Sequence, residues 1–256
     1  MTRRGATFPQ IRHAARTGLV LASVLAAGVT VSVAQEIPSA AQPDWAAYIA
    51  DTEQQRIEDV APGAPFLSLD TSEVEDIRHC RAVVYTGEVC TASLKDTDRS
   101  RSLMDVEDAL VHHWYATAVV PATTLSDTLD FVEAYELYPQ HFDEVNSVDV
   151  LERGPASLRA RLRITRKKVL TVHYNLDQHA VFTRHSDTRA SARIVTTRIR
   201  ELDDVGRPEE REKPFGDDRG FLWALKAYWR YEEVDAGVIL EAEVVRLSRR
   251  VPWALR

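Results

Sequence analysis

The sequence lacks the short motifs by which several classes of enzyme are recognised. It contains no Gly-x-Ser-x-Gly elbow of a nucleophilic hydrolase, and the glycines of Gly216–Gly220 enclose three charged residues, as in a turn rather than a phosphate loop. It has only two cysteines, and the neighbouring His112 and His113 would point to opposite faces of a strand. We therefore expect no metal site and no other cofactor, and we assign no catalytic residue.

Positive charge is scarce as well. The 256 residues include 32 Lys and Arg against 39 Asp and Glu, which gives a net charge of −7 at pH 7. Nucleic-acid-binding domains are usually basic, so a nucleic-acid partner is not expected. The apolar run Gly18–Val31 is short for a membrane span, which needs about 20 residues.

The first 34 residues have the pattern of an export signal. Four arginines and no acidic residue precede the apolar run, and Ser32-Val33-Ala34 forms a small-x-small cleavage site. We expect export to the periplasm or the cell exterior, with a mature N-terminus at Gln35; the alternative is a retained N-terminal anchor. Export would allow Cys80 and Cys90 to oxidise, although two unlinked thiols fit the sequence equally well.

The clearest pattern in the chain is Gly220–Arg249, which predicts two long strands joined by a turn at Val234–Gly237. Apolar and polar residues alternate along both strands, so each strand has one apolar face. Pairing Glu233 with Val238 would bring the two apolar sets onto one face, and a slip by one residue would scramble both faces. The cross-strand neighbours would then be Trp229 and Ala242 on the concave side, with Arg230 and Glu241, and Tyr228 and Glu243, on the other.

The rest of the chain predicts an α+β arrangement. Helical patterns cover Asp44–Val60, a short segment with a capping box at Ser72–Glu75, Thr123–Tyr135 and Tyr138–Phe142. Strand patterns cover Arg81–Tyr85 and Glu88–Ser93 as a small hairpin, then His112–Val120, Glu144–Leu151, Ser157–Ile164, Val169–Asn175, His179–His185 and Arg189–Arg200. We expect a curved antiparallel sheet of about seven or eight strands, with two short helices after its first strand.

This order resembles the helix-grip arrangement of the START-like (SRPBCC) superfamily, specifically an uncharacterised bacterial branch. The motifs that carry the resemblance are His112-His113-Trp114, Val120-Pro121, Gly216–Trp223, Tyr228-Trp229-Arg230, Glu241-Ala242-Glu243 and Leu247-Ser248-Arg249. The superfamily includes lipid-transfer domains, polyketide cyclase/aromatase enzymes and plant carriers of hydrophobic ligands. The resemblance covers roughly Gly87–Trp253 and implies a ligand cavity.

The resemblance also implies a C-terminal helix along the cavity, but the sequence reaches Arg256 where that helix would only begin. We therefore expect the C-terminal helix to be absent and an apolar groove to remain open. Asp44–Val60 is the only amphipathic stretch that could cover it. The expected division is a signal peptide at 1–34, an N-terminal extension with one helix and a small hairpin at 35–108, and a START-like ligand-binding domain at 109–256.

Aromatic residues on the two long strands are the best candidates for lining a cavity. Several alanines share their face, and such small side chains leave space that the aromatic rings alone would not fill. The alternative is that these aromatics fill a core. Polar residues could orient the head group of a ligand, or Glu241 and Glu243 could form a solvated outer face neutralised by Arg230 and Lys226. The candidate ligand-binding residues are Trp114, Trp223, Tyr228, Trp229, Arg230, Tyr231, Leu240, Glu241 and Glu243.

A basic run is the remaining candidate for a contact surface. Arg159, Arg161 and Arg163 alternate along one strand, and Arg166, Lys167 and Lys168 follow. They form either a solvated face or a contact with an anionic membrane surface. The sequence thus predicts an exported binding or carrier protein for a hydrophobic small molecule or lipid. The alternatives are a cyclase/aromatase-type enzyme that uses polar residues of its pocket, and a structural or interaction protein with a filled core.

Overall fold

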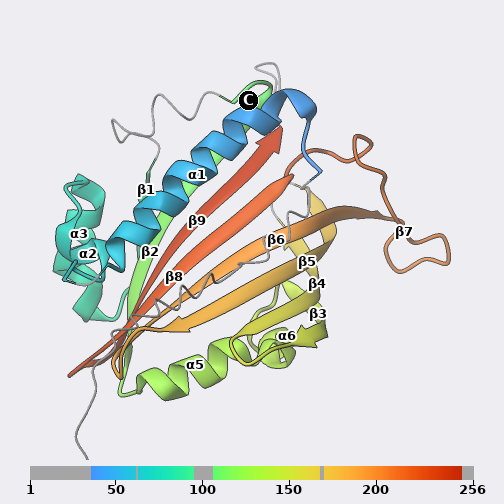
Figure 1. Ribbon diagram of the computed structural model, residues 1–256. Helices are drawn as coiled ribbons and strands as arrows, with labels where there is room; N and C mark the ends of the chain where they lie inside the picture. Colours follow the sequence, from blue (N-terminus) through green and yellow to red (C-terminus); the bar gives the residue numbers. More distant parts are fainter. Residues whose placement is uncertain (1–35, 62, 95–105, 168–169, 250–256) are drawn as a thin grey trace, which may run out of the picture. The chain divides into compact units, whose positions relative to one another are not determined.

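The computed structural model describes residues 36–61, 63–94, 106–167 and 170–249. They form an α+β fold built on one antiparallel sheet of nine strands (Figure 1). This confirms the predicted fold class and exceeds the expected number of strands. The predicted signal peptide at 1–34 and the end of the chain at 250–256 lie outside the described residues.

The strands follow the order β1-β2-β9-β8-β6-β5-β4-β3, and β7 pairs with β6. All pairs are antiparallel, and β3 to β6 are neighbours in both sequence and space, as expected for a meander. The bounds are β1 (Cys90–Ser93), β2 (Ala109–Pro121), β3 (Val145–Arg153), β4 (Ser157–Lys167), β5 (Thr171–Arg184), β6 (Arg189–Asp203), β7 (Arg211–Glu212), β8 (Ala224–Val234) and β9 (Gly237–Arg249).

The helices fall into two groups along the chain. Before the sheet come η1 (Ser39–Ala41), α1 (Gln42–Asp59), α2 (Ser68–Thr71), α3 (Glu75–Val83) and η2 (Val84–Thr86). Between β2 and β3 come α5 (Leu125–Glu133), η3 (Tyr135–Leu137) and α6 (Tyr138–His141). Thr124 caps α5 by accepting a hydrogen bond from the Asp127 backbone N–H. None of the helices in the described residues combines the length and apolar character needed to cross a membrane.

The predicted register of β8 and β9 is confirmed at every position. Glu233 pairs with Val238 across the turn, and Trp229 lies opposite Ala242. Arg230 lies opposite Glu241, with its Nε 3.0 Å from Glu241 Oε2. Gly237 begins β9 with φ at +136°, and a side chain there would place its Cβ 2.1 Å from the carbonyl oxygen of Val120. Glycine is therefore required where β9 starts against β2.

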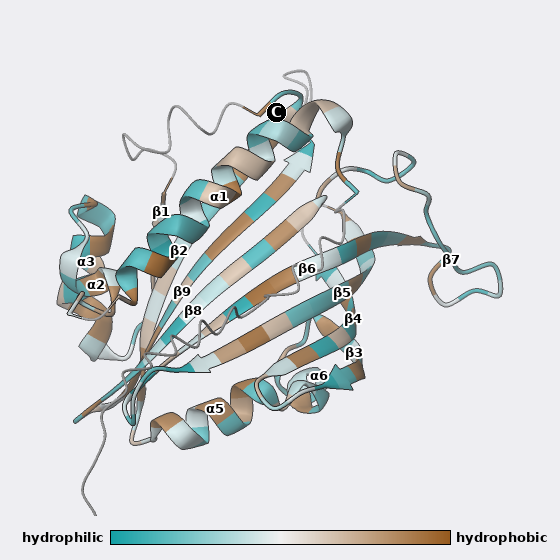
Figure 2. Ribbon diagram, in the orientation of Figure 1, coloured by the Kyte–Doolittle hydropathy of each residue, from teal (hydrophilic) through white to brown (hydrophobic). Residues whose placement is uncertain are grey.

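The alternation of side chains gives the sheet two faces of different character, and Figure 2 shows brown and teal bands alternating along β8 and β9. We call one the Trp229 face; on β2, β8 and β9 its residues include Trp114, Ala116, Trp229, Tyr231, Leu240 and Ala242. We call the other the Arg230 face; its residues there include His113, Tyr228, Arg230, Glu241 and Glu243.

Helix α1 packs on the Arg230 face, which corrects one expectation from the sequence. Trp45, Tyr48 and Ile49 of α1 share a buried cluster with Tyr228 and Val245. The segment predicted to cover the Trp229 face therefore covers the opposite one. The Trp229 face is instead contacted by α5, whose Leu125 is buried with Tyr231 and Val238.

Three local predictions are wrong. Of the hairpin expected from Arg81–Tyr85 and Glu88–Ser93, the first strand is instead part of α3 and η2, and the second contains β1, which pairs with β2. Ser72 does not cap a helix: its hydroxyl accepts from Val74 N–H, and α3 has no side-chain cap. The predicted turn at Leu176-Asp177-Gln178 is part of the continuous strand β5, with an irregularity in its pairing to β6 between Asp177 and Gln178.

The two cysteines are joined in a disulfide. Cys80 of α3 and Cys90 of β1 have Cα atoms 5.4 Å apart, which is an ordinary spacing for this bond. The bond links the helical N-terminal part to the edge of the sheet. The expected extension is therefore built into the sheet, to which it contributes β1.

Candidate ligand-binding site

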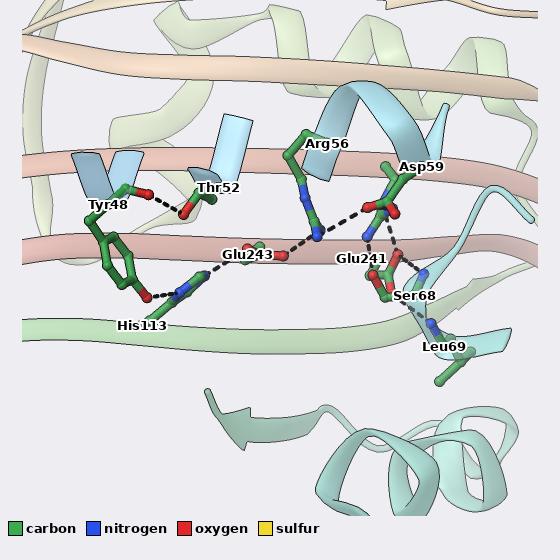
Figure 3. A network of polar contacts seen from close by, with 10 residues as sticks. Tyr48, Thr52, Arg56, Asp59, Ser68, Leu69, His113, Glu241 and Glu243 are labelled. Carbon is green, nitrogen blue, oxygen red and sulfur yellow. Dashed lines mark hydrogen bonds and ion pairs between the residues drawn. The ribbon is translucent and has the colours of Figure 1, made fainter. Parts of the chain in front are cut away.

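A chain of buried polar side chains joins α1 to the Arg230 face (Figure 3). His113 of β2 and Glu243 of β9 point toward α1, and His113 Nε2 lies 2.7 Å from Glu243 Oε1. A carboxylate can only accept, so Nε2 donates, and in the neutral ring Nδ1 is left to accept from Tyr48 Oη at 2.5 Å. Arg56 of α1 pairs with the other carboxylate oxygen of Glu243.

A second group continues this chain toward α2. Arg230 Nη1 donates to Asp59 Oδ2 of α1 at 2.9 Å, and the same guanidinium pairs with Glu241. The carboxylate of Glu241 also accepts the backbone N–H groups of Ser68 and Leu69 at 3.0 and 2.9 Å. Both buried charges thus have several partners, as burial away from water requires.

The electrostatics of Glu243 follow from these contacts. Burial acts to raise the pKa of its carboxyl, but the positive charge of Arg56 and the hydrogen bond from His113 outweigh burial and lower that pKa to about 2. Glu243 is therefore ionised at neutral pH despite being only 5% exposed.

A cavity of about 200 Å³ lies beside this network, between the C-terminal half of α1 and strands β6, β8 and β9. It is small, since pockets for organic ligands usually measure about 300–1,000 Å³. Its lining combines charged groups with apolar ones: Glu53, Arg56, Ile57, Val60, Ser191, Ala192, Arg193, Tyr228, Trp229, Arg230, Glu241 and Glu243.

The charged groups of this cavity are engaged with one another. Glu53 pairs with Lys226 at 3.0 Å and with Arg193 at 2.5 Å, and it accepts from the Tyr228 hydroxyl at 3.1 Å. Although burial opposes them, these contacts hold the pKa of Glu53 below its usual range, and burial lowers the pKa of Lys226. Because the pKa values of Glu53 and Glu243 are lowered and both groups are hydrogen-bonded, neither is poised as a general acid.

The structure divides the nine candidate residues predicted from the sequence. Five line the cavity: Tyr228, Trp229, Arg230, Glu241 and Glu243. Tyr231 and Leu240 pack against α5, and Trp223 is buried beneath α1. Trp114 lies on the Trp229 face with 43% of its surface exposed. The predicted solvated face around Glu241 and Glu243 is wrong, because α1 and α2 bury both carboxylates.

The Trp229 face is much less covered than the Arg230 face on the same strands. Along β2, Val111, His113, Tyr115 and Thr117 of the Arg230 face are all buried. Between them, His112, Ala116 and Ala118 of the Trp229 face are only half-buried and Trp114 is exposed. Leu225, Ala227, Trp229, Leu240 and Val244 continue this half-buried apolar area across β8 and β9.

Sequence reasoning missed the residues through which α1 binds the sheet. Arg56, Asp59 and Tyr48 were part of a predicted helix, but nothing in the helix alone indicates which face of the sheet it meets. His113 could have been found, because pairing β2 with β9 places it two residues from the strand neighbour of Glu243, on the same face.

The predicted basic run is paired with acidic residues. Arg159 pairs with Glu152 at 3.3 Å, and Arg161 pairs with Asp177 at 2.6 Å. Arg163 pairs with Glu210 at 2.7 Å, which lowers the pKa of that carboxyl to about 2. Arg166 pairs with Glu144, and Lys168 lies outside the described residues.

The chain matches no protein-family model and no curated protein sequence. It is similar in structure to human STARD10, with a TM-score of 0.44 and 8% identity over 72% of this chain and 73% of that one. It is also similar to a STAR-related lipid transfer protein from Xanthomonas axonopodis, with a TM-score of 0.40 and 11% identity over 64% and 86% of the two chains. An aromatase/cyclase from a Streptomyces species gives a TM-score of 0.36 and 14% identity over 56% and 72%. Lipid-transfer and aromatase/cyclase structures are thus among those to which this chain is similar.

Proposed function

We propose that this protein is an exported binding or carrier protein for a hydrophobic small molecule or lipid, and that the ligand lies on the Trp229 face. The observation that supports this most is the difference in burial between the two faces of the same strands. The Arg230 face is covered by α1, whereas the apolar Trp229 face of β2, β8 and β9 is half-buried. A contiguous exposed apolar area normally marks a binding surface.

The composition of this face suits an apolar ligand. Small residues such as Ala116 and Ala227 alternate with the large rings of Trp114 and Trp229. Trp229 and Tyr231 stack with ring planes 3° apart. Burial of apolar surface is favourable by about 25 cal/mol per Å², so exposed rings and methyl groups favour contact with a hydrocarbon.

The two alternative functions have less support. A cyclase/aromatase-type enzyme would need polar residues in its ligand pocket, but Tyr228, Arg230, Glu241 and Glu243 lie on the opposite face in mutual contacts. A protein with a filled core would bury Trp114, which is 43% exposed. The expected membrane contact through Arg159, Arg161 and Arg163 is left out of this proposal because each is paired with a carboxylate.

The proposal is tested by placing a charge on the Trp229 face. We expect Trp114→Glu to weaken binding of the uncharged amphiphile dodecanol, measured by calorimetry, by about 10-fold or more, since a buried carboxylate without a partner is costly. The matched control is Leu151→Glu on β3, because Leu151 is 50% exposed at the opposite edge of the sheet. Absence of dodecanol binding to the unmodified protein, or equal effects of the two substitutions, would contradict the proposal.

A further inference from the structure

Arg246 is a polar residue in the apolar area of the Trp229 face. It lies on β9, opposite His112 of β2 and Leu225 of β8. Two residues along the same strand, Val244 lies opposite Trp114. Arg246 therefore lies at one end of the half-buried apolar area of the Trp229 face.

Arg246 has no acidic partner among the described residues. Its Nε is buried and makes no hydrogen bond there, and no described carboxylate forms an ion pair with it. Arg230 on the neighbouring strand β8 is satisfied by contrast: it contacts Asp59, Ser68 and Glu241. A half-buried guanidinium without a counter-charge is unusual, because burying a charge costs free energy unless it is paired.

The surroundings of Arg246 confirm that its charge is not neutralised. Burial and the like charge of Arg166 lower the pKa of Arg246, while Tyr174 acts in the opposite direction. The carboxylate of Glu144 already pairs with Arg166, so it is not a counter-charge for Arg246. An anion bound here would contact the partly desolvated guanidinium of Arg246, whose Nε–H has no acceptor among the described residues.

We propose that the ligand of the Trp229 face is an amphiphile with a carboxylate head group, and that Arg246 binds this carboxylate. One unpaired guanidinium matches one negative charge, and its planar donors fit the two oxygens of a carboxylate. This inference rests on the proposed function: the apolar area holds the tail, and Arg246 adds the specificity for the head.

The dimensions of β9 agree with a long tail. From Arg246 to Leu240 the strand advances six residues, or about 20 Å at the rise of an extended chain. Val244, Ala242 and Leu240 lie along this path, with Trp114 and Trp229 on the neighbouring strands. The path ends where Leu240 packs against the cluster that contains Leu125 of α5.

The test compares dodecanoate with dodecanol, which share a tail and differ in charge. We expect the unmodified protein to bind dodecanoate about 10- to 100-fold more tightly, the range for a hydrogen bond to a charged group. Arg246→Gln should remove this preference by weakening dodecanoate binding much more than dodecanol binding, and Arg246→Lys should keep part of the preference. The control is Arg159→Gln, which removes an exposed arginine that is paired with Glu152 and should leave the preference unchanged.

Each other outcome has a definite meaning. If both amphiphiles bind equally and Arg246→Gln changes neither, the carboxylate inference is overturned while the proposed function stands. If neither binds, the proposed function fails and this inference fails with it. If dodecyl phosphate binds more tightly than dodecanoate, the head group is a phosphate and the carboxylate assignment is wrong.

A measurement without ligand separates binding from a structural role. Since Arg246 has no described partner to lose, Arg246→Gln should leave the thermal midpoint of the ligand-free protein unchanged or raise it. Dodecanoate should raise the midpoint of the unmodified protein and have less effect on the variant. A large loss of stability in the ligand-free variant would show that Arg246 is a structural residue and would overturn the inference.

Discussion

Glu243 holds Arg56 on one carboxylate oxygen and His113 on the other, below α1. Replacing Glu243 with Gln would remove a buried negative charge that faces both Arg56 and His113, and would leave Asp59 as the remaining described carboxylate beside Arg56. We expect a loss of about 3–5 kcal/mol in the free energy of unfolding, measured with denaturant. Glu152→Gln, which removes an exposed partner of Arg159, should cost at most about 1 kcal/mol. Equal losses would show that the buried network contributes nothing beyond a surface pair.

The lowered pKa of Glu243 predicts the sign of a pH effect. Its pKa is about 2 in the folded protein against an ordinary value of 4.5 for a glutamate side chain, so the unfolded chain binds the proton more tightly. The stability that this group contributes is present above about pH 4.5 and is lost as the pH falls toward 2. We expect the thermal midpoint to decrease over this range, and the decrease to be smaller in Glu243→Gln. An identical pH dependence in both proteins would contradict the assignment.

The rings of Trp229 and Tyr231 are stacked, but the two side chains differ in solvent exposure. Tyr231 is 2% exposed and is buried with Leu125 of α5, whereas Trp229 is half-buried. We expect Tyr231→Ala to cost about 3–5 kcal/mol in unfolding free energy, as for a packed aromatic, and Trp229→Ala to cost clearly less. A loss for Trp229→Ala as large as that for Tyr231→Ala would show that this ring is core rather than part of a binding surface.

The disulfide connects two elements that differ in kind, a helix and an edge strand. Cys80 and Cys90 are separated by ten residues, and a cross-link over a loop of this length stabilises by about 2–3 kcal/mol through the entropy of the unfolded chain. We expect the double variant Cys80→Ser and Cys90→Ser to lose that amount in denaturant unfolding. Treatment with a reductant should produce the same loss in the unmodified protein and none in the variant. A reductant effect of equal size in both proteins would exclude the disulfide as its origin.

The sequence was most informative where a strand has one apolar face and one polar face. Because only one register keeps both faces of β8 and β9 intact, their pairing was predictable to the residue. It was least informative where turn residues lie inside a strand. Asp177 and Gln178 are typical of turns, but β4 and β6 pair with β5 on both sides and keep it extended.

The position of α1 could not be predicted, although its existence could. Trp45, Tyr48 and Ile49 form an apolar stripe that fits any apolar surface, so hydrophobic periodicity does not distinguish the two faces of the sheet. The charges of α1 distinguish the two faces: Glu53, Arg56 and Asp59 each pair with a residue of opposite charge on the Arg230 face. The alternation along β8 and β9 already assigned the candidate residues to two faces, and the structure adds that α1 covers the face of Arg230 and Glu243.

At the scale of the whole molecule, export remains a prediction from the basic and apolar segments that precede Gln35. We expect protein recovered from the envelope of its host to begin at Gln35, which N-terminal sequencing or intact-mass measurement can determine. Cleavage would remove four arginines and no acidic residue, so the mature protein would also be more acidic. Finding Met1 or Thr2 at the N-terminus of that protein would contradict cleavage.

The contact between α1 and β9 joins residues far apart in the chain: 187 positions separate Arg56 from Glu243. Hairpins such as β8 with β9 close short loops, whereas this contact closes a long one, which disfavours its early formation. A sheet that forms before α1 docks presents Lys226, Arg230, Glu241 and Glu243 to water instead of an unbroken apolar surface. We therefore expect the charges of the buried network to oppose association between copies of the sheet before α1 docks, and to favour docking of a helix with complementary charges.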